Sequence, residues 1–336
     1  MHTQFSNVSI LALANIAGPH VLSTSAIEER FTETYARLGF EKGMIEKMTG
    51  IIERRYWDIG VQPSTIATSV AETCIEKANI PKEKIGLLIN TSVCRDYIEP
   101  SVACLIHGNL KFSANCLNFD ITNACLGFIN GMHVAGLMIE NGSIDYALIV
   151  NAESPIYGIQ QTITKLAQAD CTIEYFQNNL ATLTLGCGGA AMILCRKELA
   201  PDSPKFLGGV FQSDTNHNRL CIGQIEQMQT DTRMLLKTGV ALGIEVAKQA
   251  KWADENFDIF IPHQVSRTYI EKICEALKID FNKNYLTFPL FGNIGPASVP
   301  FALSKAIEDN TIQKGHLVGI LGFGSGVNCG LMKIQF

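Results

Sequence analysis

The sequence predicts an α/β fold that is built from two related halves, and three observations support this prediction. Patterns typical of helices alternate with short apolar runs typical of buried strands. The second half repeats the order of these elements at a period of about half the chain, which indicates a duplicated unit rather than a solenoid. Hydrophobic residues make up 47% of the 336 residues and charged residues 18%, which predicts a heavily buried interior or a large subunit interface.

The first half opens with an apolar run at residues 8–14, which has the length and composition of a strand. Residues 25–38 and 64–78 carry apolar side chains at helical spacing. The second of these helices is closed by Asn79-Ile-Pro81, where Asn and Pro are typical of a helix end. Residues 85–91 form a mostly apolar run, which predicts a buried strand.

The middle of the chain continues this alternation. Helices are predicted at residues 100–110 and 128–139, and the second is apolar and rich in small residues, so we expect it inside the molecule. Strands are predicted at residues 115–121 and 146–152. Residues 154–184 fit neither pattern, and we interpret them as a variable or mobile insertion.

The second half repeats the first after strands at residues 190–195 and 206–212. The matching segments are 238–249 with 65–78, 257–262 with 85–90, 285–297 with 116–128, and 315–324 with 144–153. We therefore predict an N-terminal half over residues 1–195 and a C-terminal half over residues 196–336. Two such halves would face each other, and a site is expected where their loops meet near the middle.

The composition argues against several classes of protein. A net charge of −5 and the lack of a run of Lys or Arg argue against nucleic acid as the main partner. No apolar stretch approaches the length of a membrane span, and the N-terminus lacks the basic head and cleavage site of a signal peptide. The eleven cysteines form no CxxC pair and lie in apolar runs, which predicts a reduced, cytoplasmic protein without a disulfide framework or a zinc site.

The stretch around Cys125 offers a candidate nucleophile. The cysteine lies between an apolar run that ends at Phe119 and the helix predicted from Phe128. It therefore falls at or next to a helix N-terminus, where backbone N–H groups and the helix dipole favour a thiolate. Gly127 allows backbone or ligand to approach closely. A structural cysteine in a small-residue turn is the alternative, and this stretch alone leaves both interpretations open.

Two further candidates lie in the second half. His263 directly follows a predicted buried strand, and Asn293 lies between glycines in a tight turn that matches the turn of Cys125. A satisfied core histidine and a plain turn asparagine are the structural alternatives. The functional interpretation is a pair of donors aimed at a carbonyl oxygen. The glycine-rich run 321–326 does not fit GxGxxG, so we interpret it as a loop of backbone N–H donors for an oxyanion rather than a phosphate cradle.

Four motifs in order carry a family resemblance, and a Thr49-Gly-Ile turn followed by Arg54 and Arg55 supports it. The motifs are Asn123-Ala-Cys-Leu-Gly-Phe128, Pro262-His-Gln264, Gly292-Asn-Ile-Gly-Pro-Ala-Ser-Val-Pro300 and Gly322-Phe-Gly-Ser-Gly326. Over essentially the whole chain, the sequence resembles the thiolase superfamily, specifically the β-ketoacyl-acyl-carrier-protein synthase III branch. The resemblance implies the duplicated five-layer α-β-α-β-α thiolase fold, a homodimer, and acyl transfer through a Cys thioester followed by Claisen condensation.

The resemblance also implies a role for each candidate residue. Cys125 would attack an acyl thioester and hold the acyl group covalently. The backbone N–H groups of Cys125 and Ser325 would form one oxyanion hole. His263 and Asn293 would polarise the carbonyl of a second thioester and stabilise its enolate. The substrates would be coenzyme A thioesters, and no metal or redox cofactor is required.

The segment Arg95-Asp-Tyr-Ile-Glu-Pro100 resembles that of OleA-type enzymes, which join two long acyl-CoA molecules head to head in bacterial olefin synthesis. In that group a glutamate at this place reaches in from the partner subunit as the base, so the resemblance implies this role for Glu99. A glutamate on a surface loop is the alternative. Arg55-Tyr-Trp57 is also similar to this group.

Contacts to CoA stay unassigned at this point. The synthases of the branch grip the adenine end of CoA with a tryptophan and an arginine, which Met44 and Met48 replace here. They also carry an asparagine where this chain has Ser266. An acyl carrier protein is a further candidate partner, for which Lys42 and Lys47 together with the two arginines that follow the Thr-Gly-Ile turn form only a thin basic patch.

The preferred interpretation is condensation of two acyl-CoA molecules without decarboxylation, with Glu99 as the base, to give a β-ketoacyl-CoA or, after hydrolysis, a β-keto acid. The alternative is a decarboxylating synthase that uses a malonyl thioester, in which Glu99 would be incidental. Acyl transfer to an alcohol or amine is disfavoured because His263 and Asn293 are both present. A non-catalytic binding partner of the same fold would be expected to lack at least one of Cys125, His263 and Asn293.

Overall fold

The computed structural model describes residues 1–336, and a large sheet forms its centre. The strands of this sheet are β1 (His2–Gln4), β2 (Val8–Ala17), β5 (Ile85–Asn90), β6 (Leu117–Asp120), β7 (Tyr146–Glu153), β8 (Gly188–Arg196), β9 (Lys205–Ser213), β12 (Ile259–Pro262), β13 (Leu317–Gly324) and β14 (Asn328–Gln335). They lie in the order β12-β13-β14-β9-β2-β8-β7-β5-β6, with β1 beside β9. Two small hairpin-like sheets pair β3 (His20–Ser23) with β4 (Glu53–Tyr56) and β10 (Cys221–Gly223) with β11 (Met228–Thr230).

The large sheet consists of two parts with the same pairing pattern. In the first part β5 is parallel to β7, and β8 is antiparallel to both β7 and β2. In the second part β12 is parallel to β13, and β14 is antiparallel to both β13 and β9. A single residue pair, Ser9 with Lys205, joins the parts through β2 and β9. The predicted duplicated α/β fold is confirmed, whereas the boundary between residues 195 and 196 stays a prediction.

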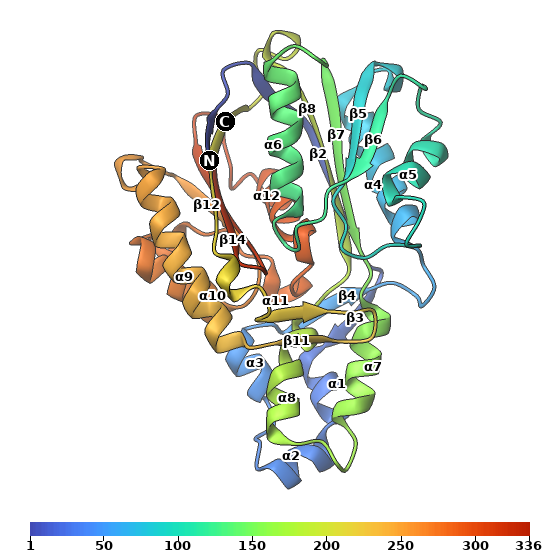
Figure 1. Cartoon of the computed structure of the whole chain (residues 1–336), viewed down its shortest axis with the longest axis vertical. Coiled ribbons are helices and arrows are strands. Elements are labelled where there is room, and N and C mark those ends of the chain that lie inside the picture. Colours follow the sequence, from blue (N-terminus) through green and yellow to red (C-terminus); the bar gives the residue numbers. More distant parts are fainter.

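Helices cover and separate the two parts of the sheet. They are α1 (Thr24–Glu29), α2 (Thr32–Leu38), α3 (Met44–Thr49), α4 (Pro63–Ala78), α5 (Val102–Leu110), α6 (Gly127–Glu140), α7 (Ile156–Leu166), α8 (Ile173–Asn179), α9 (Thr232–Gln249), α10 (Arg267–Leu277), α11 (Phe288–Phe291) and α12 (Ser298–Glu308). Helices α6 and α12 lie between the two parts, α4 and α5 cover the outer face of the first, and α9 and α10 that of the second (Figure 1). The result is the expected order of helix, sheet, helix, sheet and helix layers.

The central helix α6 packs tightly because its residues are small where it meets the strands. Met132 belongs to a core that joins Ile89 of the first part to Ile320 of the second. At Gly131 an added Cβ would lie 3.0 Å from the Ile149 side chain, so any larger residue would force the helix or the strand to shift. The helix therefore holds the turn of Cys125, which precedes it, rigidly between the two parts.

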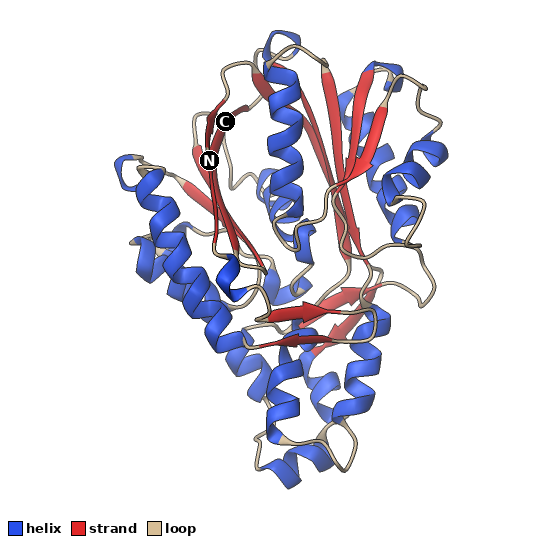
Figure 2. Cartoon of the chain, viewed as in Figure 1, coloured by secondary structure: helices blue, strands red, loops and turns tan.

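Residues 154–184 form part of a helical region below the sheets, not an unplaced insertion (Figure 2). Helices α7 and α8 pack on α1 and α2, and Phe31 and Phe176 meet edge to face at 5.6 Å in the shared core. The single helix predicted at residues 25–38 is two helices, because the chain turns out of helical geometry at Phe31, whose ring is fully buried in this core. No helix of the chain is both long and apolar enough to cross a membrane.

Candidate active site

The candidate residues of the second half and of the Cys125 turn lie on loops that follow the carboxyl ends of strands. Cys125 follows β6, His263 follows β12, Asn293 lies in the turn between α11 and α12, and Ser325 follows β13. The loop of Ser325 touches the Cys125 turn directly: a Cβ added at Gly324 would lie 3.0 Å from the carbonyl oxygen of Asn123. In α/β folds such strand ends are the usual place for a site.

Cys125 lies in a tight turn of strained backbone. The preceding residue, Ala124, has φ +45°, a left-handed conformation that is uncommon for a residue with a side chain. The Asn123 side chain fixes the turn, because its amide donates to Asn130 at 2.8 Å and its oxygen accepts from Asn328 at 3.1 Å. The turn therefore connects α6 to the start of β14, and the Cys125 side chain is left partly open.

The thiol of Cys125 is protonated in the free protein. Burial, together with the neighbouring Cys221 and Glu153, raises its pKa from the ordinary value of 9.0 to about 12, although a hydrogen bond from its own backbone N–H acts in the opposite sense. This rise corresponds to about 4 kcal/mol. A helix terminus contributes only about 0.3–1 kcal/mol. The expected thiolate-stabilising effect of α6 is therefore outweighed by burial.

His263 is buried and neutral. Its exposed fraction is 4%, and burial lowers its pKa to about 4. Nδ1 is buried without a hydrogen-bond partner, and Nε2, which no protein atom binds, retains exposed surface. A proton on Nδ1 would be a buried donor without an acceptor, which is costly. The geometry therefore favours the tautomer with its N–H on Nε2, as a neutral donor toward the open space.

Gln264 links the loop of His263 to the segment that leads to Asn293. Its side chain is fully buried, and its Nε2 donates to the carbonyl oxygens of Pro262, at 2.8 Å, and Tyr285, at 3.2 Å. Its Oε1 accepts from the backbone N–H of Thr287 at 2.8 Å. These hydrogen bonds are buried, so the Gln264 side chain fixes the distance between the loop of His263 and the segment that leads to Asn293.

The amide of Asn293 has a defined orientation. Its Oδ1 accepts from the backbone N–H of Gly295 at 2.9 Å and from the hydroxyl of Ser298 at 3.4 Å. Its backbone is paired with Thr184 and Gly186, at 2.8 and 2.9 Å. Because the oxygen is occupied, the Nδ2 group points away from these partners, and no protein acceptor binds it. Asn293 thus presents an unengaged donor, as His263 does.

The glycine-rich loop lies against the Cys125 turn. At Gly322 an added Cβ would lie 2.2 Å from the end of the Ile129 side chain, so a larger residue there would require this side chain to move. The backbone N–H of Ser325 donates to no protein acceptor. An unengaged N–H beside the nucleophile is what an oxyanion hole requires.

Glu99 lies apart from the other candidates in the single chain. It is exposed, on the loop of residues 91–101 that connects β5 to α5, and no hydrogen bond or ion pair engages its side chain. The neighbouring Tyr97 and Ile98 are also exposed, Ile98 to 92%. The structure of one chain therefore brings Glu99 to the surface rather than to Cys125.

The sequence analysis missed Glu153, the last residue of β7. Its carboxyl is buried, and burial raises its pKa to about 7. It opposes ionisation of Cys125, and a Cβ added at Gly295 would lie 3.6 Å from its Cγ, so it borders both candidate turns. The only signal in the sequence is one glutamate at the end of a long apolar run, which a strand end on the surface would produce as well.

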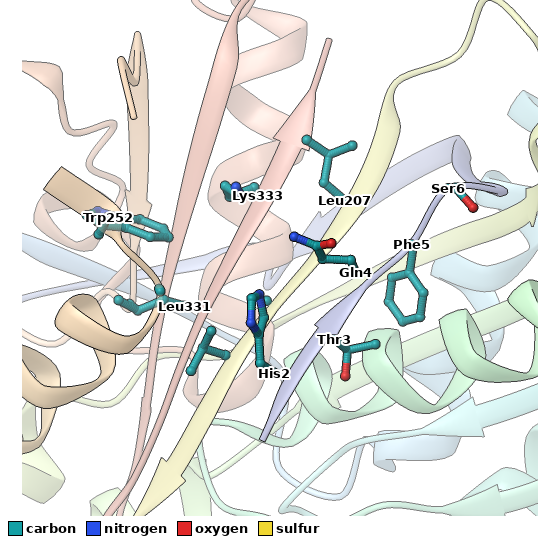
Figure 3. A pocket seen from close by; sticks show the side chains of 12 residues that line it. His2, Thr3, Gln4, Phe5, Ser6, Leu207, Trp252, Leu331 and Lys333 are labelled. Carbon is teal, nitrogen blue, oxygen red and sulfur yellow. The ribbon is translucent and has the colours of Figure 1, made fainter. Parts of the chain in front are cut away.

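A cavity of about 450 Å³ lies elsewhere, between β1, β9, β14 and Trp252 (Figure 3). None of the candidate residues lines it. No group of three His, Cys, Asp or Glu side chains is arranged to hold a metal ion. The chemistry available at the strand ends is therefore that of a thiol, a neutral imidazole, a carboxamide and backbone N–H groups.

Two family models match the chain. The one described as 3-oxoacyl-[acyl-carrier-protein] synthase III matches residues 119–215, and the one for its C-terminal part matches residues 247–336. Together they span more than half of the sequence. The chain belongs to the 3-oxoacyl-[acyl-carrier-protein] synthase III family.

Within the synthase III family, the chain is similar to proteins named acyl-CoA:acyl-CoA alkyltransferase. The protein of that name from Xanthomonas campestris is 47% identical over 98% of this chain and 99% of its own length. The one from Shewanella oneidensis is 34% identical over 99% and 100%. These matches and the fold confirm the resemblance to the OleA-type group of the thiolase superfamily.

Solved structures of the synthase III family agree with this fold throughout. A cysteine-to-serine variant of Xanthomonas campestris OleA, with bound lauric acid and lauroyl-CoA, matches 99% of this chain and 100% of its own with a TM-score of 0.96 and 46% identity. Further structures of the same OleA carry replacements of a histidine or a glutamate. The thiolase-type fold predicted from the motifs is therefore confirmed.

Proposed function

We propose that the protein condenses two acyl-CoA molecules, without decarboxylation, to a β-ketoacyl-CoA or its β-keto acid. The observations that support this proposal are the turn of Cys125, the buried, neutral His263 and the oriented amide of Asn293, each with a donor or thiol that no protein group engages. The similarity to acyl-CoA:acyl-CoA alkyltransferases over nearly the whole length supports the choice of substrates. The substrates are long-chain acyl-CoA thioesters in this proposal, as lauroyl-CoA is for the ligand-bound OleA.

In the first step Cys125 takes the acyl group. Its sulfur attacks the thioester carbonyl, the carbon–sulfur bond to CoA breaks, and the thiol proton ends on the released CoA thiol. Because burial raises the pKa of Cys125, loss of the thiol proton is expected to accompany formation of the carbon–sulfur bond. The N–H groups of Cys125 and Ser325 stabilise the oxygen that becomes negative.

In the second step the acyl group is extended. The carbonyl of a second acyl-CoA accepts hydrogen bonds from Nε2 of His263 and Nδ2 of Asn293, which stabilises its enolate. Glu99 of the partner subunit removes the α-proton. The α-carbon then attacks the acyl group on Cys125, the carbon–sulfur bond to Cys125 breaks, and the released sulfur takes up the proton that Glu99 removed. A neutral histidine suits this role, since it donates a hydrogen bond without protonating the enolate first.

We infer a homodimer in which the loop of residues 91–101 enters the partner. Exposed Val93, Tyr97 and Ile98 surround Glu99, and Leu117 is 53% exposed on the edge strand β6. Such a group of apolar side chains beside an unpaired strand edge is typical of a subunit interface. The eleven cysteines are all free, which supports a reducing, cytoplasmic location. An acyl carrier protein in place of one CoA is the alternative carrier.

The test is to incubate the purified protein with a long-chain acyl-CoA alone and to measure β-keto product and free CoA by mass spectrometry. We expect product that is abolished in Cys125→Ala and reduced at least a hundredfold in Glu99→Ala. An acyl-Cys125 adduct that turns over only after malonyl-CoA or malonyl carrier protein is added would contradict the proposal. The protein would then be a decarboxylating synthase, the activity for which its family is named.

A further inference from the structure

A buried carboxyl at the strand ends has no part in the reaction proposed above. Glu153 is 4% exposed, and no Lys, Arg or His pairs with it. Its oxygens accept hydrogen bonds from the backbone N–H groups of Val93, at 2.8 Å, and Cys94, at 3.0 Å, and from the amide of Asn151, at 3.3 Å. Burying a carboxyl group without a neighbouring cation costs free energy, so its presence at this position indicates a specific role.

The two backbone partners of Glu153 begin the loop that carries Glu99. A second anchor follows, where Asp96 accepts from the backbone N–H of Ser64 at 3.0 Å. From Tyr97 onward the loop is exposed, up to the helix α5. Glu153 therefore sets the position and direction in which the exposed part of the loop leaves the strand ends.

The other side of Glu153 faces the residues of its own site. It borders the Asn293 turn at Gly295, and its charge acts on the thiol of Cys125. The Glu153 side chain therefore borders the Asn293 turn of its own subunit. It also binds the start of the loop that, in the proposed reaction, carries Glu99 into the site of the partner subunit. Only five residues separate Val93, which Glu153 binds, from Glu99. Asp96 is the middle one of these five and is anchored to Ser64. A rearrangement at Glu153 would therefore be expected to displace Glu99.

We propose that Glu153 is a positioning residue that fixes residues 91–100 so that Glu99 enters the site of the partner subunit. The inference rests on the proposed function, because it acts through Glu99. Glu99 takes part only in the second step, so loss of Glu153 slows condensation and leaves acylation of Cys125 intact. A glutamine at this place keeps one acceptor oxygen, but its NH₂ group would face the second backbone N–H, and two donors cannot form a hydrogen bond. One of the two hydrogen bonds that hold the loop would therefore be lost.

The experiment compares Glu153→Gln with Glu140→Gln. Glu140 is a matched control, since its carboxylate also accepts from two successive backbone N–H groups, those of Ser6 and Asn7, at the far end of α6. Acylation of Cys125 in a single turnover and steady-state condensation of a long-chain acyl-CoA are measured by mass spectrometry. For Glu153→Gln we expect acylation at no less than one third of the unmodified rate, since loss of the charge that opposes ionisation of Cys125 can only favour it, and condensation reduced at least tenfold. Glu140→Gln is expected to change neither.

The second measurement combines Glu153→Gln with Glu99→Ala. If Glu153 acts through Glu99, the double variant condenses at the rate of Glu99→Ala within threefold, because the base is already lost. The inference would be overturned if the losses of condensation in the two single variants multiplied in the double variant. It would also be overturned if Glu153→Gln lost acylation as strongly as condensation. In both cases the proposed function would still stand. Full activity of Glu99→Ala would overturn both.

A second variant covers the case in which Glu153→Gln does not fold. Ser92 holds the same loop start, since its hydroxyl accepts from the backbone N–H of Ala152 at 2.9 Å and donates to Asn90 at 2.7 Å. Ser92→Ala is expected to separate acylation from condensation in the same way. Equal losses of both steps in Ser92→Ala would contradict the inference.

Discussion

The thiol of Cys125 and the imidazole of His263 are both held in their neutral forms by burial, and this is the dominant physical effect at the site. Water would stabilise a thiolate or an imidazolium, and the packed strand ends exclude most of it. The neutral pair costs less to bury than an ion pair would. Charge then develops only during the reaction, where the unengaged N–H donors of Ser325, Asn293 and His263 are available to meet it.

A first prediction concerns the pH dependence of Cys125. Since only the thiolate reacts with iodoacetamide, and burial holds the pKa at about 12, the alkylation rate is expected to rise about tenfold per pH unit from pH 7 to pH 10. Mass spectrometry of the Cys125 peptide measures the rate, with the exposed Cys104 as an internal comparison for the reagent. A plateau below pH 9 would mean that the helix terminus dominates after all.

A second prediction concerns the hydroxyl of Ser298, which is fully buried. It accepts from the backbone N–H of Ile294 at 3.0 Å and donates to Oδ1 of Asn293. Ser298→Ala frees the carboxamide to rotate, so we expect kcat of condensation to fall about tenfold, which is about 1.4 kcal/mol. Thermal unfolding should report a loss of about 1–2 kcal/mol in stability. Unchanged kcat with the same loss of stability would show that the amide orientation does not depend on this hydroxyl.

At the scale of single residues, the sequence analysis identified the candidates that lie in recognisable motifs. It missed Glu153, whose environment depends on its position in the folded chain. Cys125 and Asn293 lie in short motifs that contain glycine, and His263 lies in a Pro-His-Gln motif directly after an apolar run, so all three can be located in the linear sequence. Glu153 is one acidic residue after an apolar run, and its environment arises only when β5, β7 and the Asn293 turn meet. Burial by distant segments is not a property of the local sequence.

At the scale of elements, the glycines at the end of strand β13 determine how closely residues 322–326 approach the Cys125 turn. A Cβ added at Gly322 would lie 2.2 Å from the end of the Ile129 side chain, and one added at Gly324 would lie 3.0 Å from the carbonyl oxygen of Asn123. A side chain at either position would therefore require the Cys125 turn, the start of α6 or the loop itself to shift.

A third prediction tests this contact with Gly324→Ala. The added Cβ would lie 3.0 Å from the carbonyl oxygen of Asn123 and 3.1 Å from Leu126, so the loop must move away and carry the N–H of Ser325 with it. We expect single-turnover acylation of Cys125 to slow at least tenfold. Gly223→Ala is the matched control, because a Cβ there meets nothing within 4 Å. Equal acylation rates in Gly324→Ala and Gly223→Ala would show that this loop does not stabilise the oxyanion.

Most helices and strands were predicted from periodicity within a few residues, and the exceptions have physical causes. The strand predicted at residues 8–14 is β2 and the helix at 64–78 is α4, since each carries a clear apolar pattern. Strand β14 was not predicted. It contains Asn328, Gly330 and Lys333 among its apolar residues, and it is a strand because β13 and β9 pair with it on both sides.

At the scale of the whole molecule, duplication explains why the site forms where it does. The two parts of the sheet have the same pairing pattern and lie on either side of the central helices α6 and α12 (Figure 1). The Cys125 turn directly precedes α6, and the Asn293 turn precedes α12. The sequence repeat predicted this meeting point. It could not predict that Glu99 lies outside the site of its own chain, because no pattern in one chain encodes how a second copy packs on it.

A fourth prediction follows for mixed dimers. Glu99→Ala and Cys125→Ala homodimers should each lack condensation, because every site misses either its base or its nucleophile. In a heterodimer of the two, the site of the Glu99→Ala subunit has its own Cys125 and receives Glu99 from the other subunit. We therefore expect about half of the unmodified activity per dimer from heterodimers that are co-expressed with two different tags and purified on both. If Glu99 instead served its own chain, neither site of the heterodimer would be complete. An inactive heterodimer, with acylation of its one Cys125 intact, would thus place the base within the same subunit and contradict the proposed interface.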